Sequence, residues 1–294
     1  MKTMVTSPGH KLGQMIGNFI EEMFGKDLVS FSQRHGFYCD RKGPRPKVRG
    51  KKKKVTWIDN KGNPHDMDFV IEKDGSFERR GKPVAFIELA WRRYTKHSRN
   101  KAGEIEGALL PLRETYKDTC SFVGAILAGE FTDGGINQLV SNGIHVLHVP
   151  FSVIVECFKR KDIDLNYPED APDEVKEELI RRWESLSDKD LEDIEQCIKE
   201  KIKPEYDKFM NSLKQSLLRQ VEKVIVIPLF GNEKIFHRVE DAIEFVKEYA
   251  EVNSEENEFK EYEVYVKFTD GDKVEGRFHS KDRVLQFLTN FIID

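Results

Sequence analysis

The sequence has few of the features that mark a secreted, membrane-spanning or cysteine-based metalloprotein. Its 294 residues include four cysteines, which lie far apart and form no CxxC motif. This spacing disfavours a cysteine-based zinc site, and a reducing setting is the simplest expectation. No apolar run approaches the roughly 18 residues that a membrane span needs, and the N-terminal stretch lacks the apolar core of a signal peptide. We therefore expect a cytoplasmic protein with no membrane partner.

Several common catalytic motifs are also absent from the sequence. The stretch GEFTDGGINQ at 129–138 lacks the GxxxxGK[ST] pattern of a phosphate-binding loop. There is no GxSxG nucleophile motif and no HExxH zinc motif. His145 and His148 are three residues apart on an expected strand, so their side chains point to opposite faces and a shared metal is not expected.

Charge is abundant in this sequence but unevenly placed. The net charge is -4, yet residues 1–133 carry eight more basic than acidic residues. Residues 134–294 carry twelve more acidic than basic residues. The densest basic stretch is RKGPRPKVRGKKKK at 41–54, whose prolines and glycines favour an exposed loop. A basic N-terminal part indicates a polyanionic partner.

Hydrophobic patterning predicts an α/β fold, with a mixed central sheet flanked by helices. The expected order is helix, three strands in an antiparallel meander, helix, strand, short helix and strand. A mostly helical segment (151–220) and a small α+β subdomain (221–294) should follow this core of residues 1–150. The expected core elements are a helix at 10–25, strands at 55–59, 66–72 and 83–91, a helix at 98–116, a strand at 121–130, a helix near 136–142 and a strand at 144–150.

Carboxylates on two neighbouring strands are the candidate site for chemistry. Asp66 and Asp68 should share one strand face, and Glu88 and Ala90 should share a face of the next strand. Glu88 interrupts a strongly apolar strand, where a charge is costly unless it is paired or coordinated. If the two strands pair, Asp68 and Glu88 converge, and converging carboxylates suit Mg²⁺. Such a metal activates water and stabilises the charge of an in-line displacement at phosphorus.

The segments HDMDFVI (65–71) and AFIELAWRR (85–93) resemble the PD-(D/E)XK nuclease superfamily, the fold of many type II restriction endonucleases. The resemblance extends to the order of elements over about residues 10–150. It implies a restriction-endonuclease-like core that cleaves DNA with Mg²⁺, for which Mn²⁺ is a possible substitute. Asp68 and Glu88 would be the metal ligands, and the further metal candidates are Asp66, Glu21 and Glu22.

Ala90 departs from the family pattern, because the motif has a lysine two residues after the glutamate. That lysine would orient or deprotonate the attacking water and neutralise charge in the transition state. Three explanations are open: an engineered lysine-to-alanine change, transfer of the role to Lys96 or Lys101, or a degenerate site in a protein that only binds nucleic acid. We favour the first two, because the carboxylates and the basic flank remain.

The expected partners are double-stranded DNA and a second copy of the chain, since cutting both strands usually takes two active sites. Phosphate contacts are expected on both sides of the carboxylates in the sequence. A catalytically inactive binding protein and a nuclease acting on RNA or branched DNA are the alternatives. The expected DNA-binding residues are Arg45, Arg49, Lys51, Lys52, Lys53, Lys54, Arg92, Arg93 and Arg99.

Structural explanations remain open for several of these residues. Asp66 is also typical of a turn, here after GNPH. Glu21 and Glu22 suit the solvated side of a helix, and the lysine run at 51–54 suits a solvated loop. Trp91 is expected to pack in the core rather than to form a base-stacking platform.

Overall fold

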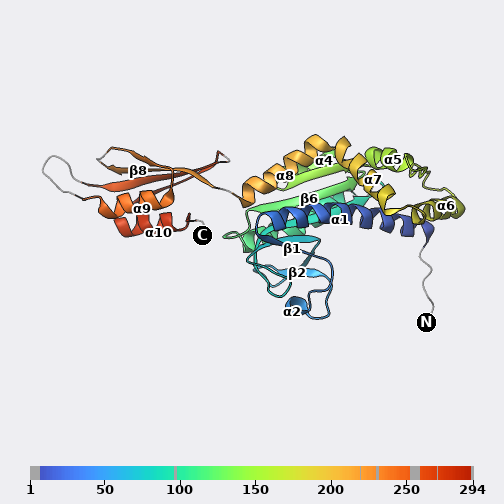
Figure 1. Ribbon diagram of the computed structural model, residues 1–294, viewed down its shortest axis with the longest axis horizontal. Helices are drawn as coiled ribbons and strands as arrows, with labels where there is room; N and C mark the ends of the chain where they lie inside the picture. The colour runs from blue at the N-terminus through green and yellow to red at the C-terminus, as the bar shows by residue number, and fades with distance from the viewer. Residues whose placement is uncertain are drawn as a thin grey trace. The chain divides into compact units, whose positions relative to one another are not determined.

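The chain contains two compact units, Met1–Leu213 and Lys214–Asp294, which we call unit 1 and unit 2. A computed structural model (Figure 1) describes residues 7–95, 98–218, 220–229, 232–251, 259–269 and 271–292. Within these segments no helix combines the length and apolar character needed to cross a bilayer.

Unit 1 is built on a mixed five-stranded sheet in the order β1-β4-β5-β6-β7. β1, β4 and β5 pair antiparallel, whereas β5, β6 and β7 pair parallel. The interior strand β6 is buried along its whole length, as its continuous apolar sequence predicts. The α/β class with a mixed sheet is therefore confirmed. The strands are β1 (Phe37–Arg41), β4 (Phe69–Lys73), β5 (Lys82–Arg92), β6 (Phe122–Gly129) and β7 (His145–Pro150).

The antiparallel part of this sheet differs from the expected meander. The predicted strand at 55–59 exists as β2 (Val55–Ile58), but it pairs with β3 (Pro64–Met67) in a separate two-stranded sheet. β1 takes its place beside β4. The pattern FYCDR did not indicate β1, because the charged Asp40, its fourth residue, interrupts the apolar run, although the structure buries this residue. The predicted strand at 66–72 is also divided, since the chain bends at Asp68 between β3 and β4.

Helices cover both faces of the unit 1 sheet. α1 (Pro8–Arg34) runs across one face (Figure 1), and Ser7 caps its start. On the same side the Phe19 ring packs against Phe158 and Trp183. α3 (Ser98–Thr115) and α4 (Asp133–Ser141) cover the other face, where they share an apolar cluster with β5 and β6.

Four further helices follow the sheet in sequence, and Ser187 caps one of them with a capping box to Asp190. A disulfide joins Cys157 to Cys197 and so links two of these helices, while Cys39 and Cys120 are free and buried. The spacing of the cysteines suggested a reducing setting, and this bond does not fit that expectation. Sequence spacing alone does not show which cysteines meet in the fold. The helices are α5 (Phe151–Lys159), α6 (Asp173–Glu184), α7 (Asp188–Lys201) and α8 (Lys203–Leu217).

Unit 2 is an antiparallel sheet in the order β11-β10-β8-β9 with two helices, as expected for a small α+β subdomain. Alternate residues of β10 are buried, which is typical of a sheet covered on one face. Its core includes Val226, Tyr262 and Leu288. The elements are β8 (Val221–Leu229), β9 (Lys234–Phe236), α9 (Val239–Glu248), β10 (Glu261–Phe268), β11 (Lys273–Phe278) and α10 (Lys281–Thr289).

Candidate active site

The fold brings Asp68 and Glu88 together where β4 begins. Phe69 pairs with Ile87 in the antiparallel register, which places Asp68 across from Glu88. One Asp68 carboxylate oxygen, Oδ2, accepts a hydrogen bond of 2.7 Å from the backbone N–H of Leu89. The two carboxyl groups that the sequence singled out therefore lie side by side, held by strand pairing rather than by a flexible loop.

Both carboxyl groups are costly to ionise in this position. Burial raises the pKa of Asp68 well above its usual range, and the charge of Glu21 adds to this effect. Burial also raises the pKa of Glu88, and the neighbouring Asp68 carboxylate raises it further. Among the described residues no group donates a hydrogen bond to Oε1 of Glu88, which is buried. A divalent cation would neutralise this pair and bond that oxygen.

A lysine lies near the pair, but it comes from α3 rather than from β5. The charge of Lys101 lowers the pKa of both Asp68 and Glu88, opposing the effect of burial. Its Nζ is 3.1 Å from a carboxylate oxygen of Glu104, and its side chain is only 20% exposed. The other candidate, Lys96, lies outside the described residues. Lys101 is thus the described lysine best placed to act on the carboxylates.

Ala90 faces the apolar layer between β5 and α3. Its residue surface is only 3% exposed, and it belongs to a core cluster with Phe86, Ala102 and Ile105. The position is on the same strand face as Glu88, as predicted. The structure therefore surrounds Ala90 with packed side chains, whereas Lys101 approaches the carboxylates from the facing helix.

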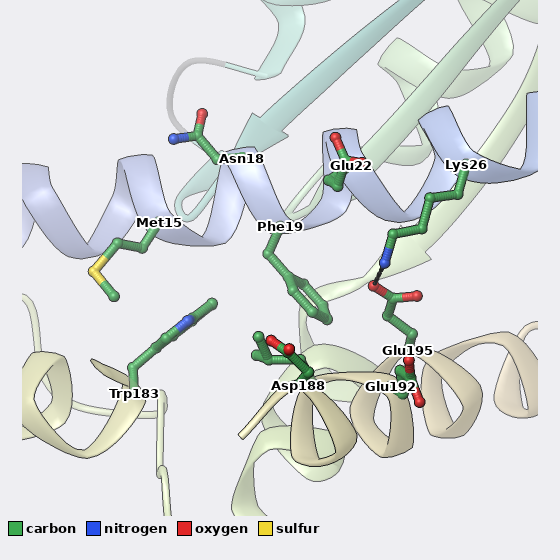
Figure 2. A pocket seen from close by; sticks show the side chains of 10 residues that line it. Met15, Asn18, Phe19, Glu22, Lys26, Trp183, Asp188, Glu192 and Glu195 are labelled. Atoms are coloured by element: carbon green, nitrogen blue, oxygen red, sulfur yellow. Dashed lines mark hydrogen bonds and ion pairs between the residues drawn. The ribbon is translucent and has the colours of Figure 1, made fainter. Parts of the chain in front are cut away.

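The two glutamates of α1 have different surroundings. Glu21 acts on the pKa of Asp68, so it lies on the side of the helix near the carboxyl pair. Glu22 instead accepts a hydrogen bond of 2.9 Å from the Arg41 guanidinium. Glu22 lines a pocket of about 500 Å³. Figure 2 shows Glu22 there together with Phe19 and Trp183. Consecutive residues of a helix point about 100° apart, so Glu22 points away from the side that Glu21 occupies. The metal role expected of Glu22 is therefore not supported.

Asp66 lies near enough for its charge to raise the pKa of Glu88, but its oxygens are bonded elsewhere. It lies on β3, where its oxygens accept hydrogen bonds of 2.6 Å from both Lys54 and Thr56. The alternation that predicted a shared face with Asp68 fails because the chain bends between β3 and β4. Across the described segments, no group of three or more His, Cys, Asp or Glu residues is arranged to hold a metal. Any cation here would rest on two carboxylates and complete its shell with water and substrate oxygens, as Mg²⁺ commonly does.

Two arginines that were expected to bind DNA are internal. Arg45 is fully buried and donates hydrogen bonds to Asp40 and Glu72 at 2.8 Å each. Arg49 also donates to Asp40, at 2.6 Å. DNA contacts at Arg45 and Arg49 are therefore wrong predictions. The buried carboxylates need these guanidinium partners, and a basic stretch in the sequence does not show which of its members turn inward.

The remaining basic residues form a mixed set. Arg93 donates hydrogen bonds to the carbonyls of Leu165 and Tyr167, and its guanidinium lies 3.6 Å from the centre of the Tyr167 ring, so it holds the fold together. Arg92 is half-buried, and the side chain of Arg99 lies outside the described residues. The exposed lysines of the basic stretch are Lys42, Lys47, Lys51, Lys52, Lys53 and Lys54, and Lys47 is paired with Glu78.

Lys42 is a site residue that the sequence did not single out. Its charge lowers the pKa of Asp68, so it lies close enough to influence the carboxyl pair. Its position directly after the edge strand β1 was the available signal. That signal could not be used, because β1 itself was not predicted.

Searches against known protein families and against curated proteins find no match. Among solved structures, the protein of unknown function AF1548 is similar over 65% of this chain and 99% of its own. The sequence identity is 15% and the TM-score is 0.30. A likeness at this level assigns no function to either protein.

Proposed function

We propose that unit 1 hydrolyses phosphodiester bonds in DNA with a divalent cation, as a restriction-type endonuclease. The observation that carries this proposal is the buried Asp68–Glu88 pair, with a Glu88 oxygen that no described residue hydrogen-bonds and the Lys101 ammonium acting on both groups. The resemblance of HDMDFVI and AFIELAWRR to PD-(D/E)XK nucleases supports the same activity.

The side chains of the pair fit a hard cation such as Mg²⁺ or Mn²⁺. Asp68 and Glu88 would hold it, and when bound it supplies Lewis-acid polarisation of the phosphate and a more acidic water. The Leu89 N–H holds Asp68 in place through its hydrogen bond. Lys101 would take the role of the missing motif lysine by stabilising negative charge that develops on the phosphate oxygens. We thus favour transfer of the lysine over its removal.

Exposed lysines at 51–53 support a polyanionic substrate. Lys51, Lys52 and Lys53 are exposed, and none has an ion pair to another described residue. Such cations bind phosphates without reading sequence. Because two nicks on opposite strands usually require two active sites, we propose that the working form is a symmetric homodimer, which sedimentation analysis would test.

The test is cleavage of plasmid DNA with Mg²⁺ by the full chain and by single variants. We expect Glu88→Gln to abolish cleavage and Lys101→Met to lower the rate by about 10²- to 10⁴-fold, the usual contribution of such groups. Lys117→Met is the matched control, because Lys117 is exposed just after the same helix and pairs only loosely with Glu114. Full activity in Lys101→Met would refute the role of that lysine.

The missing motif lysine also favours a second candidate, an inactive protein that binds DNA without metal. Calorimetric titration of Mg²⁺ into the wild-type protein and Glu88→Ala separates the two. The nuclease proposal requires binding heat that disappears in the variant, while the binding protein should give the same result with both. Parallel incubation with duplex, flap, junction and RNA substrates would identify a nuclease specific for RNA or branched DNA.

A further inference from the structure

We propose that a trough beside the carboxyl pair holds one unpaired nucleobase of the strand that is cut. This inference rests on the proposed function and specifies its substrate. The trough has a volume of about 450 Å³ and lies between α1 and the end of β5. That volume falls in the range of small-ligand sites. We call it the α1 trough; its lining includes Gly9, Gly13, Gly17, Glu21, Trp91 and Arg92.

The trough adjoins the carboxyl pair through Leu89, one of its lining residues. Leu89 donates its backbone N–H to Asp68 at 2.7 Å. Glu21, one turn of α1 beyond Gly17, lines the trough as well. A nucleotide seated in the trough would have its phosphate at the Leu89 end, which is the end next to Asp68.

Three glycines of α1 keep the trough open at a cost in helix stability. Gly9, Gly13 and Gly17 recur every four residues, so they share one helix face. Each glycine inside a helix lowers stability by roughly 1 kcal/mol relative to alanine.

Packing within the protein does not require glycine at these positions. A Cβ atom would lie 3.9 Å from the nearest Trp91 atom at Gly13 and 3.8 Å at Gly17, which are ordinary van der Waals distances. Gly25 of the same helix is different, because its Cβ would lie 2.8 Å from Arg41. Contacts within the protein therefore do not explain why Gly9, Gly13 and Gly17 lack side chains. Space for a ligand explains it better.

Trp91 gives the trough a surface on which a base can stack. It is half-buried rather than part of the core, and the Phe151 ring packs near it, 5.9 Å between centroids. Trp91 also lines the trough, so its indole is not wholly covered by Phe151. Stacking of a base on an aromatic ring contributes about 1–3 kcal/mol.

The other walls suit the edge and the phosphate of a nucleotide. Gln14 and Asn18 bring amide groups that can both donate and accept hydrogen bonds. Arg92 uses one nitrogen to bond the Trp91 carbonyl at 2.9 Å, and its remaining N–H groups can reach a phosphate. A base inside a duplex is stacked and paired, so only a bulged, overhanging or extruded base can enter.

The test measures DNA binding in the absence of divalent metal, so it does not depend on cleavage. The probe is 2-aminopurine in one DNA sequence, placed either in a base pair or in a one-nucleotide bulge. We expect the wild-type protein to bind the bulged probe at least about tenfold more tightly and to quench its fluorescence, which corresponds to one stacking contact.

Two variants and one control assign this preference to the α1 trough. Gly13→Leu fills the trough with a good helix former, and Trp91→Leu removes the stacking surface; both should bind the paired and bulged probes equally. Gly107→Leu is the matched control on α3, where an added Cβ meets nothing within 4 Å, and it should keep the preference. Thermal unfolding checks that each variant is folded.

The possible results separate this inference from the proposed function. Equal wild-type affinity for both probes, or a preference that survives in both trough variants, overturns the α1 trough as a base site. If the preference depends on the trough but Mg²⁺ produces no cleavage of any DNA, the base site stands and the hydrolase proposal fails. Cleavage without a bulge preference rejects the trough alone.

Discussion

The Glu88 carboxyl lies in an apolar strand beside a second acid, and both features raise its pKa. As the pH rises toward the raised pKa of about 8, the metal-free folded protein must ionise a group that prefers to stay neutral. The stability that the protonated carboxyl contributes is complete below the pKa of the unfolded chain, and it is lost as the pH rises through the folded value. Each pH unit between the two values changes stability by about 1.4 kcal/mol.

We therefore predict that Glu88→Gln makes the metal-free protein less sensitive to alkaline pH. Urea unfolding near pH 5 and near pH 8 should show a smaller loss of stability in the variant than in the wild type. Added Mg²⁺ should raise wild-type stability at the higher pH only, because protons compete with the cation at low pH. The same pH dependence in both proteins would show that Glu88 does not carry this effect.

Arg45 is predicted to matter for stability and not for DNA. Arg45→Met leaves Asp40 and Glu72 buried without their shared cation, which should lower the free energy of unfolding by about 3–5 kcal/mol. DNA affinity of the folded variant, measured by fluorescence anisotropy, should stay within about twofold of wild type. Lys52→Gln is the control, and it should change affinity with little effect on stability. A large loss of affinity in folded Arg45→Met would return this residue to the DNA surface.

These residues show what the sequence could and could not predict about the site. Asp68 and Glu88 were predictable because a carboxylate in an apolar strand is costly without a function or a partner. Arg45 was not, because its partner Glu72 lies 27 residues away, and a local basic pattern does not contain that contact. Lys101 remained one of two candidates, since its closeness to the pair depends on the packing of α3 against β5, which the sequence does not show.

At the scale of elements, the loop of exposed lysines after α2 (Pro46–Arg49) should control how DNA binding depends on salt. Replacing Lys51, Lys52 and Lys53 with glutamine is expected to reduce the slope of log affinity against log salt by up to about three, one for each lost phosphate contact. A matched triple variant at Lys117, Lys159 and Lys189, which are exposed elsewhere, should leave the slope unchanged. Equal slopes in the two triple variants would contradict a DNA-facing loop.

The elements themselves were predictable where the apolar pattern was long and regular. β6 and α1 are of this kind, although α1 extends nine residues beyond the expected end at 25. β1 was missed because it carries Asp40, a buried acid whose charge is balanced by arginines from the following segment. The break at Asp68 was missed because no proline or glycine marks it, and the strand sequence continues unchanged in character.

At the scale of the whole molecule, each unit has buried apolar packing of its own. The sequence indicated a small α+β subdomain at 221–294, but it set the helical segment 151–220 apart from the core at 1–150, whereas Met1–Leu213 is one unit. The order of elements indicated the mixed sheet of unit 1. The pairing of Cys157 with Cys197 could not be predicted, because it depends on how α5 and α7 pack.

Separate cores predict two unfolding transitions in the full chain. Leu109 is fully buried in the core of unit 1, and Leu288 is fully buried in that of unit 2. Truncating either leucine to alanine should lower the stability of its own unit by about 2–5 kcal/mol. In differential scanning calorimetry, Leu109→Ala should shift one transition and Leu288→Ala the other. A single transition that both substitutions shift together would mean that the two cores unfold as one, and a substitution in unit 2 would then also affect the carboxyl pair of unit 1.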